Sequence, residues 1–118
     1  MAFPFINPVA TILSGTSLSG AVSLSGRAVC GVILPATWTA AVLTFQGSVD
    51  GRNFFNLFDS GGVEISATVT VLQFIGLSAS DFAGCSHIKV RSGTSGSPTN
   101  QGADRLLTMA LRQIPNVP

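Results

Sequence analysis

The sequence predicts an all-β fold, a single antiparallel β-sandwich of about eight strands with jelly-roll or Greek-key connections. Several short stretches alternate apolar and polar residues with a period of two, which is typical of strands that bury one face. Glycine, proline and Asn or Asp residues separate these stretches. The 118 residues contain almost no stretch with the spacing of an amphipathic helix, and this length suits one domain.

The two ends of the chain are expected to lie outside the sandwich. Residues 1–10 are predicted to form an extended N-terminal arm, because Pro4 and Pro8 exclude a helix there. The sandwich domain then comprises residues 11–112, and residues 113–118 form a C-terminal tail.

The arm and the tail carry large apolar side chains of a kind that a free terminus rarely has. They are Phe3, Phe5 and Ile6 in the arm and Ile114 in the tail. These side chains are expected to dock, either on their own domain or on a neighbouring subunit.

The first third of the domain predicts three strands. Residues 9–13 form the first, and residues 17–24 form the second, in which Val22 and two leucines share one face. Residues 28–34 are nearly all apolar, which predicts a strand covered on both faces.

The strongest local signal is a hairpin over residues 38–58. Asp50-Gly51 lies between two apolar segments, a pattern typical of hairpin turns. In the first segment Leu43 and Phe45 alternate with polar residues, which predicts a strand with one buried face.

Turn-forming residues mark the later connections. Residues 61–62 form a turn, residues 77–84 a loop or a single helical turn, and residues 92–102 a flexible polar loop. Between the first two connections, residues 63–77 predict one long strand.

Two further strands are expected near the C-terminus. Residues 86–91 alternate well, so that His87, Lys89 and Arg91 share one face. The spacing of residues 105–112 suits a strand or a helix, and the surrounding strands favour a strand.

Charge is scarce in this chain. Charged residues make up 9% of it, against about 25% in an average soluble domain, the net charge is +1 and the mean hydropathy is +0.51. Such a balance fits a membrane span, an ordinary soluble monomer, or a subunit whose surface other copies or a larger body cover. The last is favoured, because near-zero net charge removes repulsion between molecules.

A membrane span would have to lie in residues 28–45, which carry no charge. Pro35 and several threonines interrupt this stretch, and two successive strands explain it better. The N-terminus lacks the positive region and unbroken apolar core of a signal peptide. With no span favoured, no membrane is expected as a partner. The Lys and Arg residues are scattered, so nucleic acid is not expected either.

No catalytic or metal-binding set is evident. Cys30 and Cys85 are expected to be buried free thiols, with a single bridge as the alternative. His87 is the only histidine, and together with Cys85 it would supply only two of the four ligands of a zinc site. Neither a nucleophile elbow nor a phosphate-binding loop is present. The protein is therefore expected to have no cofactor and not to be an enzyme.

The aromatic residues indicate a binding surface. Trp38 either stacks on a sugar ring or anchors a loop, and the second role is favoured. Phe54, Phe55 and Phe58 place aromatic rings on both faces of one strand, so at least one points outward. The candidate contacts with a subunit or a capsid are Phe3, Phe5, Ile6, Phe54, Phe58 and Ile114.

Three stretches of the sequence form a set: Leu34-Pro35-x-x-Trp38-Thr39-x-Ala41, then Leu43-Thr44-Phe45-Gln46-x-Ser48-x-Asp50-Gly51, then Lys89-Val90-Arg91-Ser92-Gly93-Thr94 followed by Asn100-Gln101. In this order they resemble a group of small β-sandwich proteins of tailed bacteriophages. These are capsid decoration, or cement, proteins and the bases of head fibres and head spikes. The resemblance covers residues 12–112.

A second, shorter element also resembles a known pattern. Ser48-x-Asp50-Gly51-x-x-Phe54-x-x-Leu57 is similar to an element of many carbohydrate-binding and discoidin-like sandwiches, in which Trp is often found at the position of Phe54. A tight hairpin requires Asp50 and Gly51 in any case.

The resemblance to decoration proteins implies a virion structural protein. Such a protein would bind the outer surface of the shell of major capsid protein, stabilise it and self-associate as a dimer or trimer. It would be assembled in the host cytoplasm and lie on the capsid exterior. The alternatives are a carbohydrate-binding or adhesion module of a head fibre or tail, which would bind a glycan through Trp38 or Phe54, and a tail or neck connector.

Overall fold

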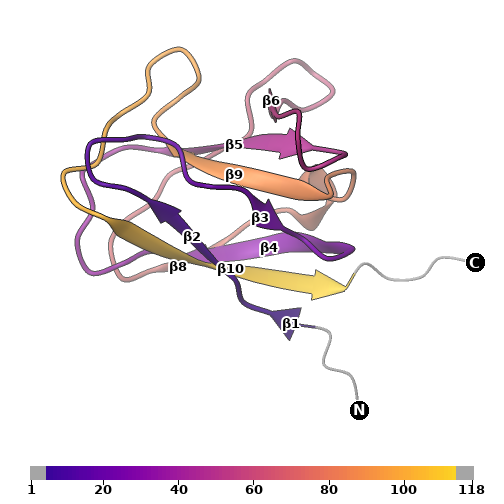
Figure 1. Ribbon diagram of the computed structural model, residues 1–118, viewed down its shortest axis with the longest axis horizontal. Coiled ribbons are helices and arrows are strands. Elements are labelled where there is room, and N and C mark those ends of the chain that lie inside the picture. Colours follow the sequence, from indigo (N-terminus) through magenta and orange to yellow (C-terminus); the bar gives the residue numbers. More distant parts are fainter. Residues whose placement is uncertain (1–4, 114–118) are drawn as a thin grey trace, which may run out of the picture.

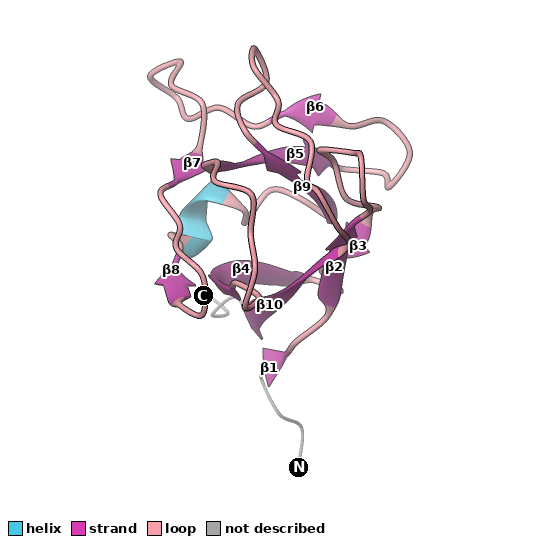
Figure 2. Ribbon diagram, turned by 90° about the vertical axis from the view of Figure 1, so that its left-hand side faces the viewer, coloured by secondary structure: helices cyan, strands magenta, loops and turns pink. Residues whose placement is uncertain are grey.

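The computed structural model describes residues 5–113, and of residues 5 and 6 it describes only the backbone. Ten strands form two five-stranded antiparallel sheets that face each other, and a 3-10 helix η1 (Ala79–Asp81) lies between two of the strands (Figures 1 and 2). The predicted all-β sandwich is therefore confirmed.

Each sheet has two long central strands and short strands at its edges. The first, which we call the β10 sheet, contains β1 (Phe5–Ile6), β2 (Val9–Ile12), β10 (Arg105–Gln113), β4 (Arg27–Ile33) and β8 (Phe74–Gly76). The second, the β9 sheet, contains β3 (Val22–Ser23), β9 (His87–Ser92), β5 (Leu43–Ser48), β6 (Phe55–Asn56) and β7 (Ser66–Ala67).

The strand order is that of a jelly roll. In the β10 sheet β1 and β2 share one edge of β10, and in the β9 sheet β6 and β7 share one edge of β5. We count each such pair as one strand and number the resulting eight strands in chain order. Their spatial order is then 1-8-3-6 in the β10 sheet and 2-7-4-5 in the β9 sheet. The chain thus alternates between two sheets, as in a double-sheet jelly roll.

Part of the predicted N-terminal arm belongs to the sheet. β1 and β2 pair with β10 in one continuous register, from Phe5 opposite Arg112 to Ile12 opposite Arg105. Pro8 lies between β1 and β2 and stays in register with β10, because its carbonyl accepts a hydrogen bond from the Met109 amide at 2.8 Å. Residues 5–10 are extended, as predicted, and they form an edge of the sandwich.

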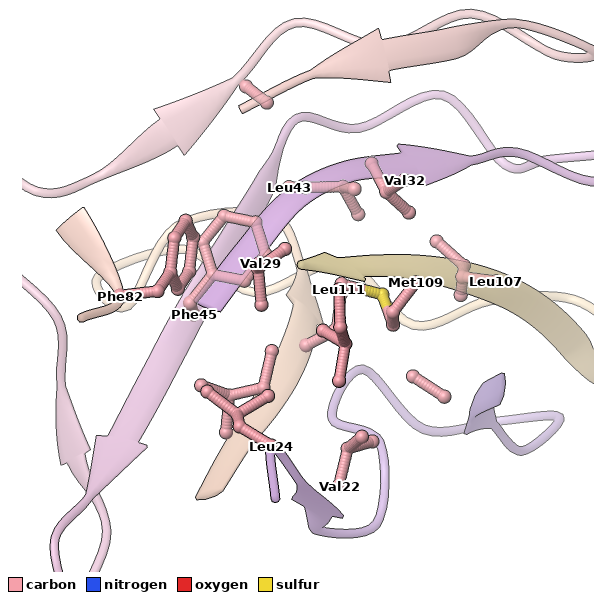
Figure 3. Packing of buried hydrophobic residues seen from close by; sticks show 14 of the residues in the cluster. Val22, Leu24, Val29, Val32, Leu43, Phe45, Phe82, Leu107, Met109 and Leu111 are labelled. Atoms are coloured by element: carbon pink, nitrogen blue, oxygen red, sulfur yellow. The ribbon is translucent and has the colours of Figure 1, made fainter. Parts of the chain in front are cut away.

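The core lies between the sheets and is built from alternate residues of the central strands. Leu43 and Phe45 of β5 point inward, as predicted, and so do alternate residues of β10 (Figure 3). Ile88 and Val90 of β9 are buried in the same core. The Phe45 ring meets the edge of the Phe82 ring, with centroids 5.0 Å apart and planes at 88°. Phe82, which directly follows η1, is fully buried.

Several strands are shorter than predicted. The prediction of one long strand over residues 63–77 is wrong, because the chain crosses there from β7 in one sheet to β8 in the other. Of residues 17–24, only Val22 and Ser23 form a strand, although Val22 and Leu24 are buried as expected.

The strands expected over residues 28–34, 86–91 and 105–112 are confirmed as β4, β9 and β10. β4 is not covered on both faces, however, because Ile33 is exposed on its outer side. The helical turn allowed for residues 77–84 is η1.

Candidate interaction surfaces

The outer face of the β9 sheet is polar and covered by the chain itself. His87, Lys89 and Arg91 share this face, as the sequence predicted, opposite Ser48, Gln46 and Thr44 of β5. Residues 49–65, which include β6, lie beyond these two strands (Figures 1 and 2).

Arg91 fixes this covering segment to the sheet. Its guanidinium lies 3.5 Å from a Glu64 carboxylate oxygen and donates hydrogen bonds to Asn56 Oδ1 at 2.6 Å and Thr44 Oγ1 at 3.3 Å. Glu64 also accepts from the amide of Ser95, which joins a second loop to the network. With Arg91 almost completely buried and each polar group satisfied, the role of this network is structural.

The two aromatic residues that were considered for sugar stacking are both half-buried. The Lys89 ammonium lies 4.5 Å from the centroid of the Phe54 ring, so that ring already has a cation over its face. Trp38 packs against the core, and its Nε1 donates to the carbonyl of Ala41 at 3.2 Å. This geometry matches the loop-anchoring role predicted for Trp38.

The Ser48-x-Asp50-Gly51 element forms a hydrogen-bonded turn. Ser48 Oγ accepts from the Gly51 amide at 2.8 Å, and Asp50 Oδ1 accepts from the amides of Arg52 and Asn53, each at 2.9 Å. Gly51 has φ +77°, and a Cβ there would lie 2.9 Å from Cε1 of His87. Glycine is therefore required both for the backbone conformation and for the close packing of His87.

Because of Asp50, the stability of the protein should decrease at low pH. The backbone amide of Asn53, then that of Arg52 and the side chains of Asn53 and Ser48, holds the pKa of the Asp50 carboxyl well below its ordinary value of 3.8. The stabilisation is therefore complete above pH 3.8 and is lost as the pH falls from there through the folded pKa. We expect Asp50→Asn to have a lower melting temperature than wild type at pH 7, and the difference between the two melting temperatures should decrease below pH 3.8. A gap that stays constant in thermal melts from pH 7 to pH 2 would contradict this.

Among the described residues, the histidine, its neighbouring serine and the two cysteines do not form a catalytic arrangement. Ser86 Oγ lies 2.9 Å from His87 Nδ1, but these residues are adjacent in sequence, and Ser86 Oγ also contacts the carbonyl of Ser48. Cys30 and Cys85 are free thiols, as predicted, but both are only half-buried and not buried as expected. Desolvation raises the pKa of the Cys85 thiol, which disfavours the reactive thiolate. Within residues 5–113, no group of three or more His, Cys, Asp or Glu side chains is placed to hold a metal ion.

A groove of about 390 Å³ lies on the side of the sandwich where β2 and β3 form neighbouring edges. Its lining contains only apolar, glycine and threonine residues: Val9, Thr11, Leu13, Thr16, Leu18, Gly20, Ala21 and Val22. No group in this lining can act as a general acid or base at neutral pH.

Among the described residues, the outer face of the β10 sheet is largely apolar and exposed. Four large side chains on it keep a substantial part of their surface exposed: Phe74 60%, Leu106 55%, Val9 47% and Ile33 40%. The sheet register places nine uncharged residues on this face: Val9, Thr11, Gly31, Ile33, Phe74, Gly76, Leu106, Thr108 and Ala110. The alternation along β10 also places the charged Arg112 on this side, next after Ala110. We call these nine residues the outer sheet face.

Leu72 extends this apolar character beyond the strands. It is 73% exposed, has φ +57° and donates its amide to the carbonyl of Pro35 at 3.2 Å. A leucine in this left-handed conformation costs about 1–2 kcal/mol, and its exposed side chain recovers little of that within the molecule.

A second set of exposed apolar side chains lies on the opposite side of the sandwich, in the segment that covers the β9 sheet. It comprises Val49, Phe55, Phe58 and Val63. The Asp59 amide donates to the carbonyl of Val63 at 2.8 Å, so that Phe58 and Val63 belong to one small hairpin. We call these four residues the apolar hairpin residues.

The contact residues suggested by the sequence lie in different places. Phe58 is exposed among the apolar hairpin residues, whereas Phe54 is half-buried under Lys89. Phe5 and Ile6 form β1 opposite Arg112 and Leu111, and their side chains lie outside the described part of the chain, as do Phe3 and Ile114.

Sequence reasoning missed the outer sheet face. Its members come from four strands that are distant in the sequence, and only the sheet register brings them together. The alternation in residues 105–112 was the available signal, since it places Leu106 opposite to the buried Leu107.

Comparisons with protein-family models, with curated proteins and with solved structures found no match for this chain. Within the described residues 5–113, no helix is long and apolar enough to cross a membrane.

Proposed function

We propose that this chain is a structural protein of a bacteriophage virion, a capsid decoration protein that binds the outside of the shell of major capsid protein and stabilises it. One observation carries this proposal. Residues 5–113 leave two apolar surfaces exposed on opposite sides of the sandwich, the outer sheet face and the apolar hairpin residues. Large exposed apolar surfaces mark sites of association.

The scarcity of charge supports the same proposal. A soluble protein that works alone is kept apart from its neighbours by charge, and this chain has a net charge of only +1. A subunit held between other subunits has no such requirement. Two surfaces also fit a decoration protein that contacts the shell on one side and a further subunit on another.

A binding role also fits the rigidity of the molecule. The core is closed by long central strands, and the loops over the β9 sheet are tied down by Arg91 and Glu64. Contacts from such a module stabilise the assembled shell in proportion to their preference for the assembled state. We assign the shell contact to the apolar hairpin residues, because Phe58 is exposed and is also one of the contact residues that the aromatic pattern of the sequence suggests.

Shell binding can be tested with particles that have been stripped of this protein. We expect added wild-type protein to bind stripped particles and to raise the temperature at which they release DNA. A Phe55→Ser, Phe58→Ser variant should bind at least about ten times more weakly, because it removes two exposed aromatic anchors. Leu13→Ser is the control, since Leu13 is also exposed but lies beside the β2–β3 groove.

Two outcomes would contradict the proposal. One is that stripped and decorated particles have equal thermal resistance. The other is that wild-type protein does not bind the particles at any concentration tested.

A further inference from the structure

We propose that Arg105, Thr37 and Thr39 form a binding site for one carboxylate group. The site lies at the end of the sandwich where β10 begins, away from Phe5 and Gln113 (Figure 1). It includes no member of the outer sheet face or of the apolar hairpin residues, so the proposal does not depend on shell binding. It rests on the surroundings of a buried cation, on the direction of two hydroxyl groups and on the rigidity of the loop that carries them.

The two buried arginines of the chain have different partners. Arg91 and Arg105 are 6% and 9% exposed, and Arg91 has the Glu64 carboxylate 3.5 Å from its guanidinium. In the described part of the chain, no carboxylate oxygen lies within 4.0 Å of the Arg105 guanidinium. The carboxylate of the adjacent Asp104 instead accepts a hydrogen bond from the Ser14 amide at 2.8 Å. Because a buried charge is costly unless it is paired, the positive charge of Arg105 favours the approach of an anion.

Uncharged oxygen atoms accept the hydrogen bonds of the Arg105 guanidinium. Its Nε donates to Gln101 Oε1 at 3.0 Å, and its Nη1 and Nη2 donate to the hydroxyl oxygens of Thr37 at 2.7 Å and Thr39 at 3.3 Å. A hydroxyl group has a single proton, and an oxygen that accepts from a cation directs this proton away from the cation. Thr37 and Thr39 are both exposed. Their two hydroxyl protons can therefore be donated to an acceptor that arrives from the solvent.

The loop that carries the two threonines is held in place by Gln101. The Gln101 side chain is almost completely buried; it accepts from the Thr39 amide at 2.8 Å and donates to the Thr39 carbonyl at 3.0 Å. Trp38, between the two threonines, packs against the core. The donors are thus fixed before a ligand binds, which lowers the entropic cost of binding.

The charge and the donors of the site fit a carboxylate. One guanidinium balances one negative charge, and two hydroxyl donors match the two oxygens of a carboxylate. A phosphate group carries about 1.5–2 negative charges at pH 7, and the exposed Asp104 beside Arg105 disfavours the extra charge. An uncharged amide of the same shape would gain no attraction from the guanidinium.

Nuclear magnetic resonance of the full chain, titrated with sodium acetate at constant ionic strength, tests the site. We expect saturable shifts of the Arg105 Nε–H signal and of the Thr39 amide signal, with a dissociation constant of about 1–50 mM for a single small contact. Acetamide, which has the shape of acetate without its charge, should shift neither signal. The Nε–H signal of Arg91 is the internal control, because Glu64 already supplies its carboxylate.

Two substitutions of Thr37 separate binding from folding. Thr37→Val removes the hydroxyl but keeps the branched shape, and it should raise the dissociation constant for acetate about tenfold. Thr37→Ser keeps the hydroxyl and should bind acetate like wild type. Since Thr37 is exposed, both variants should fold, which their amide spectra report directly.

Either a free carboxylic acid or an acidic side chain of a protein partner can supply this group. Attachment to a protein surface would compensate for weak affinity, because it raises the effective concentration of the carboxylate. Stripped particles distinguish the two sources, and this comparison alone depends on shell binding. Weaker binding of Thr37→Val than of Thr37→Ser to the particles assigns the carboxylate to the shell, whereas equal binding assigns it to a free acid.

Three results would overturn the proposal. The first is that acetate, well above the expected range, causes no saturable shift at Arg105. The second is that acetamide or inorganic phosphate shifts the same signals at lower concentration than acetate. The third is that Thr37→Val binds acetate as tightly as wild type.

Discussion

Replacing Phe45 by alanine is expected to lower the free energy of unfolding by about 3–5 kcal/mol. Phe45 is completely buried between the sheets, and its ring packs against the Phe82 ring. Domains of this size have a total stability of only about 5–15 kcal/mol, so the variant should unfold at a much lower urea concentration than the wild type. Urea unfolding monitored by circular dichroism measures the change.

Two further variants make this prediction specific. Phe55→Ala removes a ring of the same kind that is mostly exposed, and it should change the stability by less than about 0.5 kcal/mol. A double-mutant cycle of Phe45→Ala and Phe82→Ala should give a coupling of about 0.5–1.5 kcal/mol for the edge-to-face contact. Equal costs for Phe45→Ala and Phe55→Ala would mean that the core is not packed as described.

The sequence predicts the central strands well, because their side chains face two distinct environments. In β5, β9 and β10 one set of alternate residues meets the core, so the period of two is strong. Arg105 is an exception to this pattern. Because a charged residue is expected to point outward, it was not recognised as buried. It occupies an inward position at the end of β10, where Gln101 Oε1 and Thr37 Oγ1 accept its hydrogen bonds at 3.0 and 2.7 Å.

The edge strands and crossings could not be predicted from local pattern. β7 and β8 lie in different sheets, and the turn between them uses Leu72 at positive φ, where turn-forming residues are usual. Because Val71-Leu72 carries no such signal, residues 63–77 read as one strand. A crossing of this kind depends on tertiary contacts, such as the hydrogen bond from the Leu72 amide to the Pro35 carbonyl.

The candidate surfaces were predictable to different degrees. The aromatic residues Phe54, Phe55 and Phe58 predicted at least one outward ring, and the rings of Phe55 and Phe58 are exposed. Phe54, which the sequence suggested as a contact in place of Phe55, is half-buried. The outer sheet face depends on register between strands that are up to about a hundred residues apart, and register between distant strands is not encoded in any one stretch. Local pattern therefore indicated part of the surface assigned to the shell but not the outer sheet face.

Gly93→Ala is expected to lower the free energy of unfolding by about 2–5 kcal/mol, through two separate effects. Gly93 has φ +88°, a conformation that costs an L-residue about 1–2 kcal/mol. A Cβ at this position would also lie 2.6 Å from both the Ser97 carbonyl oxygen and the Thr99 amide nitrogen. Both are backbone atoms, so no side-chain rotation can relieve the contact.

The surroundings of Gly93 prevent the loop from moving away. Its amide donates to the Val42 carbonyl at 2.7 Å, and Thr44 Oγ1 donates to the Gly93 carbonyl at 2.7 Å, which ties the position to the start of β5. Shifting the loop would break these buried hydrogen bonds. The steric effect, about 1–3 kcal/mol for an overpacked site, should therefore add to the conformational one.

Gly62→Ala separates the two effects. Gly62 has a similar φ of +81°, but a Cβ there would meet no atom within 4 Å. This variant should cost only the conformational penalty of about 1–2 kcal/mol. Urea unfolding of both variants gives the steric contribution as the difference between them. If Gly93→Ala is no less stable than Gly62→Ala, the close approach of residues 97–99 to Gly93 is wrong, and with it the packing of the polar loop against β5.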